Sequence, residues 1–148
     1  MILVDNRRAR AEYETLETFQ AGIVLTGPEV KSLRHKSGSL HGSFVKSVGG
    51  ELFLIGAQIS PYPFANNTEY DPKRTRKLLL KKREIIVLSE ITQQKGKTLV
   101  PLSFVLAHNT IKLNFAVARG KKLHDRRREL KERDIKRETQ KELKNKRY

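Results

Sequence analysis

Phe44-Val-Lys-Ser-Val-Gly-Gly-Glu-Leu-Phe-Leu-Ile55 carries the clearest fold signal in this chain. Two short runs of β-branched, aromatic and aliphatic residues flank the pair Gly49-Gly50. Glycine adopts the positive φ angles that a two-residue hairpin turn requires, and the flanking residue types favour strands. The segment therefore predicts a β-hairpin with strands over 44–48 and 51–55.

A second hairpin is predicted further along the chain. Its strands span Thr98–Ala107 and Thr110–Ala118, on either side of His108-Asn109. In the later strand every second residue is apolar, namely Ile111, Leu113, Phe115 and Val117. A period of two gives the strand one buried face and one open face. The residues on the open face would be Lys112, Asn114 and Ala116.

Local signals predict three further segments. Tyr13–Leu25 has the composition of a strand, with Gly22 as a bend or bulge. Thr26-Gly-Pro-Glu29 matches a capping box, so we expect a short helix to begin there. A second helix is expected over Lys82–Lys95, with Gly96 as its natural stop.

Several short strands with two or three small helices predict a mainly β fold. We expect an antiparallel closed β-barrel of the oligonucleotide-binding kind, followed by a basic C-terminal tail. The charge divides the chain in the same way, since residues 1–118 hold 17 basic and 10 acidic side chains and residues 119–148 hold 14 and 6. We therefore predict a β-barrel RNA-binding domain over 1–118 and a basic tail over 119–148.

Composition narrows the class of partner. A net charge of +15 and a pI near 10.3 favour a polyanion, either nucleic acid or an anionic membrane surface. The absence of cysteine excludes disulfides and fits a reducing compartment. The apolar pattern contains neither a secretory signal nor a membrane helix, so we expect a cytoplasmic protein without a membrane partner.

The tail combines high helix propensity with few apolar residues. Favourable i,i+4 pairs such as Glu129 with Arg133 support a helix, but the aliphatic residues are too sparse to form a core-facing stripe. We expect the tail to be disordered when free and helical when RNA neutralises its charge. A solvated helix without a partner is the alternative. A membrane-bound helix would need bulky apolar residues on one face, which the tail lacks.

No catalytic or metal-binding pattern is found. The four histidines lie without metal-ligand spacing, at His35, His41, His108 and His124. Asp125 beside His124 could act as an acid–base pair, but a tail lacks the rigid support that catalysis needs. No Gly-rich phosphate loop occurs. We predict no enzyme activity, no catalytic residue, no metal, no cofactor and no small-molecule substrate.

Four regions, in order along nearly the whole chain, resemble the small protein B family of bacterial SsrA-binding proteins. They are Asn6-Arg-Arg-Ala-Arg10 with Tyr13, Ala21–Gly27 with Glu29–Arg34, Asp71–Leu80 with Arg83-Glu84, and Ala118–Arg127 with Lys131–Asp134. The resemblance implies binding to the elbow of the tRNA-like domain of transfer-messenger RNA. It also implies delivery, together with elongation factor Tu, to stalled ribosomes for trans-translation.

The resemblance assigns particular residues to these partners. The RNA-binding face would comprise Gln20, Leu79 and Lys112, with auxiliary contacts from Arg7, Arg8, Arg10, Lys31 and Arg34. The tail would enter the decoding centre of the small-subunit ribosomal RNA and the empty mRNA channel. Its ribosome-binding residues would be Gly120, Lys121, Lys122, His124, Asp125, Arg126 and Arg127.

Simpler interpretations of these residues remain open. By residue type alone, Leu79 fits a core, Lys112 fits a solvated strand face, and the N-terminal arginines fit a frayed end. Two positions depart from the family pattern, which commonly has His at the position of Ala11 and Glu at that of Gln20. Gln20 keeps an acceptor but weakens any contact to an RNA amino group or 2′-hydroxyl.

A general RNA-binding role is the alternative function. A ribosomal protein or RNA chaperone with a basic arm would have the same composition. It would bind tRNA-like and unrelated RNA about equally, whereas a small protein B should prefer the tRNA-like elbow.

Overall fold

The computed structural model describes residues 1–121, which form a mainly β fold with three helices. The strands are β1 (Ile2–Asp5), β2 (Tyr13–Ile23), β3 (Gly38–Ser39), β4 (Phe44–Val48), β5 (Glu51–Ile55), β6 (Gln58–Ile59), β7 (Arg76–Leu79), β8 (Thr98–Ala107) and β9 (Thr110–Gly120). The helices are α1 (Arg7–Glu12), α2 (Gly27–Arg34) and α3 (Lys82–Thr92). The mainly β class and the small helices predicted from the sequence are confirmed.

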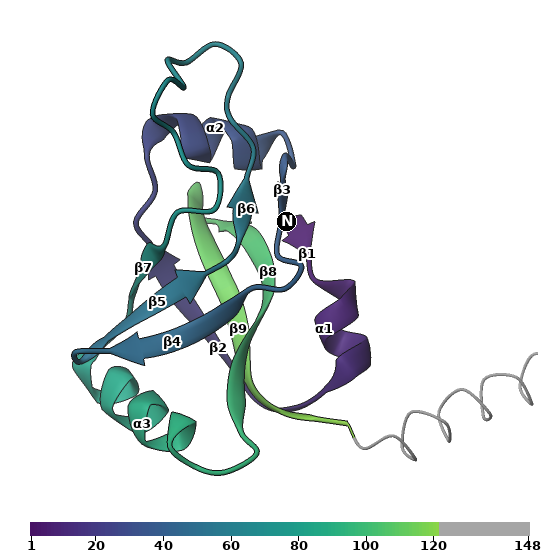
Figure 1. The fold of residues 1–148 in the computed structure, drawn as a ribbon, viewed down its shortest axis with the longest axis vertical. Coiled ribbons are helices and arrows are strands. Elements are labelled where there is room, and N and C mark those ends of the chain that lie inside the picture. The colour runs from purple at the N-terminus through teal and green to yellow at the C-terminus, as the bar shows by residue number, and fades with distance from the viewer. Residues whose placement is uncertain (122–148) are drawn as a thin grey trace, which may run out of the picture.

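Seven strands form one antiparallel sheet in the order β1-β8-β4-β5-β7-β2-β9. β8 pairs with both β4 and β9. The series of pairings from β8 through β4, β5, β7, β2 and β9 therefore returns to β8. The strands β3 and β6 pair separately. Helices α2 and α3 lie at opposite ends of the sheet, and α1 lies beside β1 (Figure 1).

Both predicted hairpins are confirmed. Gly49 and Gly50 join β4 to β5 with φ angles of 58° and 78°. His108 and Asn109 join β8 to β9 with φ angles of 50° and 64°. Both turns therefore have positive φ at their two central residues, which suits the right-handed twist of the paired strands.

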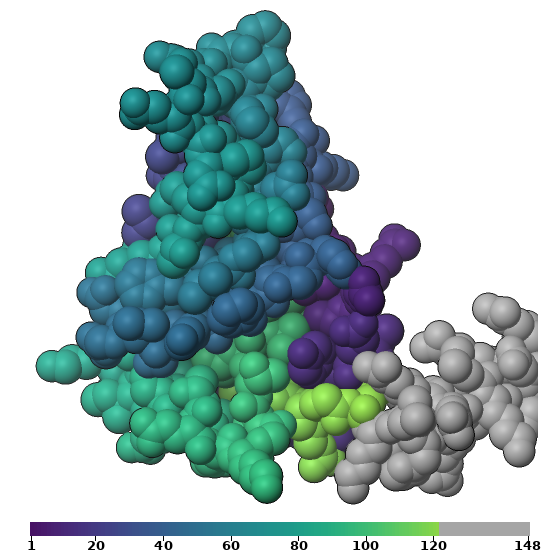
Figure 2. Space-filling view, viewed as in Figure 1, coloured from purple at the N-terminus to yellow at the C-terminus, as the bar shows by residue number. Residues whose placement is uncertain are grey.

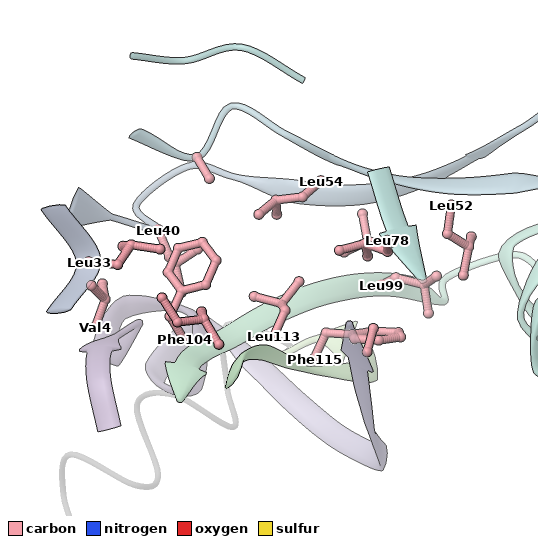
Figure 3. Close-up of a cluster of buried hydrophobic side chains, with 14 of the residues drawn as sticks. Val4, Leu33, Leu40, Leu52, Leu54, Leu78, Leu99, Phe104, Leu113 and Phe115 are labelled. Atoms are coloured by element: carbon pink, nitrogen blue, oxygen red, sulfur yellow. The ribbon is translucent and has the colours of Figure 1, made fainter. Parts of the chain in front are cut away.

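The core lies between facing strands of the sheet. Leucines from β5 and β7 meet side chains from β8 and β9 across it (Figure 3). The buried members include Leu52, Leu54, Leu78, Leu99, Leu113 and Phe115. The alternation predicted in β9 is confirmed on this side. The prediction that the opposite face is open is wrong at Ala116, which is buried. Ala118 is also buried, in a small cluster with Ala9 of α1 and Val100.

The N-terminal segment is more ordered than the sequence suggested. β1 pairs with β8, and the Asn6 side chain accepts a hydrogen bond from the Ala9 N–H, which starts α1. The Asn6 amide also donates to the carbonyl oxygens of Pro101 (2.8 Å) and Leu40 (3.3 Å). A buried side chain with three hydrogen bonds anchors α1, so the frayed-end alternative is wrong.

Other local predictions need correction. The irregular step in β2 lies between Thr15 and Glu17, whereas Gly22 keeps regular pairing, so the predicted bulge at Gly22 is wrong. α3 ends at Thr92, earlier than predicted, because the N–H of Gln93 bonds the Glu90 carbonyl in a tighter turn. Gly96, with φ of 83°, follows that turn.

Candidate nucleic-acid interface

Gly22 of β2 stands between two residues that sequence analysis assigned to RNA binding. It pairs with Leu79 of β7 on one side and with Lys112 of β9 on the other. Two residues earlier, Gln20 pairs with Asn114 of β9. Cross-strand partners point to the same side of a sheet, and so do residues two apart. These five residues therefore form one surface, which we call the Gly22 face.

The Gly22 face points outward. Leu79 is 52% exposed, whereas its neighbour Leu78 is 1% exposed and belongs to the core. Gln20 is exposed and Lys112 is half-buried. Of the two interpretations of Leu79, the structure thus supports the surface position.

The absence of a side chain at Gly22 keeps the centre of this face flat. A Cβ atom there would lie 3.2 Å from the Cβ atom of Leu79, closer than ordinary van der Waals contact. The bare backbone between Leu79 and Lys112 lets a flat or bulky ligand approach closely.

The Gln20 side chain is held by a hydrogen bond to a neighbour on the Gly22 face. Its Nε2 atom donates to Oδ1 of Asn114 at 2.9 Å. Its Oε1 atom accepts no hydrogen bond from residues 1–121, so an acceptor is available to a ligand.

The N-terminal arginines occupy different surroundings. Arg10 lies 3.0 Å from a carboxylate oxygen of Asp5 and lines an open pocket of about 370 Å³ together with Gln20 and Asn114. Arg8 donates to Glu12 (2.7 Å) and bonds His41, next to a separate pocket of about 510 Å³. Arg7 is exposed on α1. Only Arg10 is thus seen to border the Gly22 face.

α2 carries the two remaining basic candidates. Nη2 of Arg34 lies 3.4 Å from Oδ1 of Asn109, in the turn that precedes Lys112 in β9. Nζ of Lys31 lies 5.5 Å from the ring centroid of Tyr62. Arg34 therefore lies at the turn between β8 and β9, while Lys31 lies against the loop between β6 and β7.

Residues 119–121 of the predicted tail are described. Gly120 ends β9 opposite Tyr13, and the N–H of Lys121 donates to the Glu12 carbonyl oxygen at 3.0 Å. β9 thus continues past the predicted strand end at Ala118. The remaining tail candidates lie outside the described residues, namely Lys122, His124, Asp125, Arg126 and Arg127.

A buried ionic cluster that was not predicted from the sequence joins α2 to β7 and the loop before it. Glu29, expected only as a helix cap, also accepts hydrogen bonds from the guanidinium groups of Arg74 and Arg76 and from the Tyr70 hydroxyl. Arg76 is fully buried and also donates to the Ala57 carbonyl oxygen at 2.8 Å. The only sequence signal was the cluster of basic residues that follows Asp71.

Electrostatics in this cluster favour the ionised carboxylate. Burial raises the pKa of Glu29, but hydrogen bonds from Arg74, the Thr26 N–H and Arg76 outweigh it and lower this pKa to about 2. Burial and the neighbouring Glu29 charge raise the pKa of Tyr70. The cluster is therefore an ion pair at neutral pH, and it ties α2 to β7.

Within residues 1–121, no group of three or more His, Cys, Asp or Glu side chains could hold a metal ion. In the same part of the chain, no helix has the length and hydropathy of a membrane span.

A mainly antiparallel β fold with a flat outward face that carries apolar and basic side chains is compatible with the class of small β proteins that bind nucleic acids. Comparison with known proteins identifies the family. The chain belongs to the SmpB protein family, whose model matches residues 3–145.

The relatives cover nearly the whole chain. The SsrA-binding protein of Synechococcus sp. (strain JA-2-3B'a(2-13)) is 52% identical over 143 residues, covering 96% of this chain and 93% of the relative. The SsrA-binding protein of Aquifex aeolicus is 50% identical over 145 residues, covering 97% and 92%.

A solved structure gives the same result. A chain in the structure described as "tmRNA-SmpB: a journey to the center of the bacterial ribosome" is similar with a TM-score of 0.68 and 47% identity. The match covers 80% of this chain and 84% of the other.

Proposed function

We propose that this protein binds the tRNA-like domain of transfer-messenger RNA and delivers it to stalled ribosomes for trans-translation. One structural observation supports this proposal most directly. Gln20, Leu79 and Lys112, which lie far apart in the sequence, meet around Gly22 on one outward face. Membership of the SmpB family and similarity to a structure of tmRNA with SmpB support the same function.

The Gly22 face offers three kinds of contact to a folded RNA. Lys112 neutralises a phosphate, and Leu79 covers a ribose or base edge from which water is excluded. The free acceptor of Gln20 takes a hydrogen bond from a 2′-hydroxyl or base amino group. Such contacts recognise shape more than sequence, which suits the bend where the D- and T-loop regions of a tRNA-like domain meet.

The sheet closes as a barrel in this proposal. The ring of pairings from β8 through β4, β5, β7, β2 and β9 back to β8 supports a closed antiparallel barrel of the oligonucleotide-binding kind. Closure would hold β7, β2 and β9 rigidly beside one another. A rigid scaffold keeps the three contacts in register for the RNA.

The proposal divides the chain between two partners. The domain over 1–118 binds transfer-messenger RNA, with Arg7, Arg8, Arg10, Lys31 and Arg34 as auxiliary contacts. The tail over 119–148, with the residues assigned above, occupies the decoding centre and the empty mRNA channel and becomes helical there. Elongation factor Tu joins through the RNA. The protein acts in the cytoplasm and carries out no reaction, since peptidyl transfer belongs to the ribosome.

Binding selectivity tests this function. The dissociation constant of the full chain is measured for a tRNA-like fragment of transfer-messenger RNA and for an unrelated hairpin of equal length, at near-physiological salt. We expect a preference of about a hundredfold or more, roughly 2.7 kcal/mol. Equal affinities would instead identify a general basic RNA binder, and the proposed function would be withdrawn.

A further inference from the structure

The loop between β6 and β7 exposes an aromatic side chain to solvent. Tyr62-Pro63-Phe64-Ala65 forms a β-turn in which the Ala65 N–H donates to the Tyr62 carbonyl oxygen at 3.1 Å. Proline in the second position suits such a turn. Phe64, in the third, is 87% exposed. The loop projects from one end of the molecule (Figure 2).

Phe64 is the outermost member of a stack of rings. It meets the Tyr62 ring edge-on, with ring centroids 5.5 Å apart and an interplanar angle of 66°. Tyr62 in turn stacks on the imidazole of His35 from α2's C-terminal end, at 6.3 Å and 11°. The Lys31 ammonium lies over the same tyrosine ring. The stack therefore combines flat apolar surface with a cation.

The loop is braced on both sides. The Asn67 amide donates to the carbonyl oxygens of Tyr62 (2.8 Å) and Ala65 (3.1 Å), which fixes the turn. On the β7 side, the Tyr70 hydroxyl oxygen lies 2.8 Å from the Ile59 carbonyl oxygen and 3.1 Å from the Glu29 carboxylate, so it joins the buried Glu29 cluster. Phe64 is thus presented on a fixed support, which lowers the entropy lost when a partner binds.

The surroundings of the stack are basic. Lys31, Arg34 and Lys36 are all exposed on α2 and the turn that follows it. Arg34 also lies 3.4 Å from Asn109, in the turn that precedes the strand carrying Lys112. An exposed aromatic ring among cations matches a nucleobase flanked by phosphates, since every base has a π-face and every nucleotide carries a charge.

We propose that Phe64 and Tyr62 form a stacking site for an unpaired RNA base, with Lys31 and its neighbours neutralising the adjacent phosphates. The inference rests on the proposed function but adds a contact outside the Gly22 face. Two RNAs could supply the base, the transfer-messenger RNA on that face or ribosomal RNA.

Two substitutions at one exposed position separate stacking from simple apolar contact. Phe64→Leu keeps an apolar side chain but removes the ring, and Phe64→Trp enlarges the ring. We expect the leucine variant to bind RNA about tenfold more weakly, and the tryptophan variant to bind at least as tightly as the unchanged protein. Ile86→Ala on α3, where the side chain is 53% exposed, is the matched control and should change nothing.

Two binding measurements locate the base. One measures affinity for the tRNA-like fragment, and the other measures affinity of the preformed complex with full-length transfer-messenger RNA for ribosomes. A loss in the first assigns the base to transfer-messenger RNA, and a loss in the second alone assigns it to ribosomal RNA. If Phe64→Leu matches the unchanged protein in both, the stacking site is refuted. Refutation of this kind, with the preference for the tRNA-like fragment intact, leaves the proposed function standing.

Discussion

Glu29 combines a local and a long-range role. As a cap it accepts the Thr26 N–H at 2.9 Å, and as a counter-ion it accepts from Arg76 Nε at 2.8 Å. Both Glu29 and Arg76 are buried, so neither charge is solvated by water. A buried ion pair of this kind adds little over apolar packing, but the loss of one partner leaves a buried charge uncompensated.

Glu29→Gln is therefore expected to lower the free energy of unfolding by about 3–5 kcal/mol, measured by denaturant titration. The matched control is Glu51→Gln, which removes the exposed pair with Lys77 at 3.0 Å. That change should cost under about 1 kcal/mol. Similar losses in the two variants would show that the buried cluster is no more important than a surface pair.

The same carboxylate predicts an acid dependence of stability. Its pKa is about 2 in the folded protein and has an ordinary value of 4.5. The unfolded chain therefore takes up the proton first as pH falls. The contribution of Glu29 is fully present above pH 4.5 and is lost as pH falls from there toward 2. We expect the stability difference between the unchanged protein and Glu29→Gln to shrink over that window in unfolding titrations at stepped pH.

Gly50 and Gly27 offer a paired test of backbone conformation. Both have open space around the position of a Cβ atom, but only Gly50 has a positive φ, of 78°. Gly50→Ala should lower the free energy of unfolding by about 1–2 kcal/mol. Gly27→Ala, at the start of α2, should be neutral or stabilise by about 0.4–1 kcal/mol. Equal effects of the two changes in thermal unfolding would contradict the assigned turn.

In the proposed interface, the neighbouring strands β7, β2 and β9 each supply a different kind of contact. The salt dependence of RNA binding distinguishes the ionic contact from the apolar one. Lys112→Gln should weaken binding of the tRNA-like fragment and make the slope of log affinity against log salt shallower by roughly one. Leu79→Ala should weaken binding on the order of tenfold without changing that slope, because apolar contact releases no counterion.

Lys46→Gln provides the control for the charge change, since Lys46 is exposed on β4, away from these three strands. It should leave the affinity and the slope nearly unchanged. A shallower slope for Leu79→Ala, or an unchanged slope for Lys112→Gln, would contradict the division of contacts between the two strands. Titrations of a labelled fragment at four or more salt concentrations resolve the difference.

Elements with strong local signals were the ones that sequence analysis predicted well. The Gly-Gly pair, the alternation in 110–118 and the capping box at Thr26 each use residues within a few positions of one another. β1 and α1 were missed because their order depends on distant partners. The Asn6 side chain that starts α1 reaches Pro101 and Leu40, and nothing near Asn6 in the sequence signals those contacts.

The whole molecule carries its charge unevenly, which predicts separable functions. The Lys121 N–H donates to the Glu12 carbonyl oxygen at the end of β9. A C-terminal truncation that keeps this hydrogen bond must therefore retain Lys121. Ending the chain there should leave most of the affinity for the tRNA-like fragment and abolish rescue of stalled ribosomes in a reconstituted translation assay. A truncated chain that lost most of its RNA affinity would contradict this division.

The family, the mainly β class and both hairpins follow from the order of residues alone, because strand alternation, turn glycines and motif spacing are local properties of the chain. The grouping of Gln20, Leu79 and Lys112 around Gly22 required the pairing of β2 with both β7 and β9. The Glu29 cluster and the Phe64 stack likewise join segments that are distant in sequence. Side-chain periodicity tells which face of a strand is buried, but it does not tell which strands lie side by side, and the proposed interface depends on that arrangement.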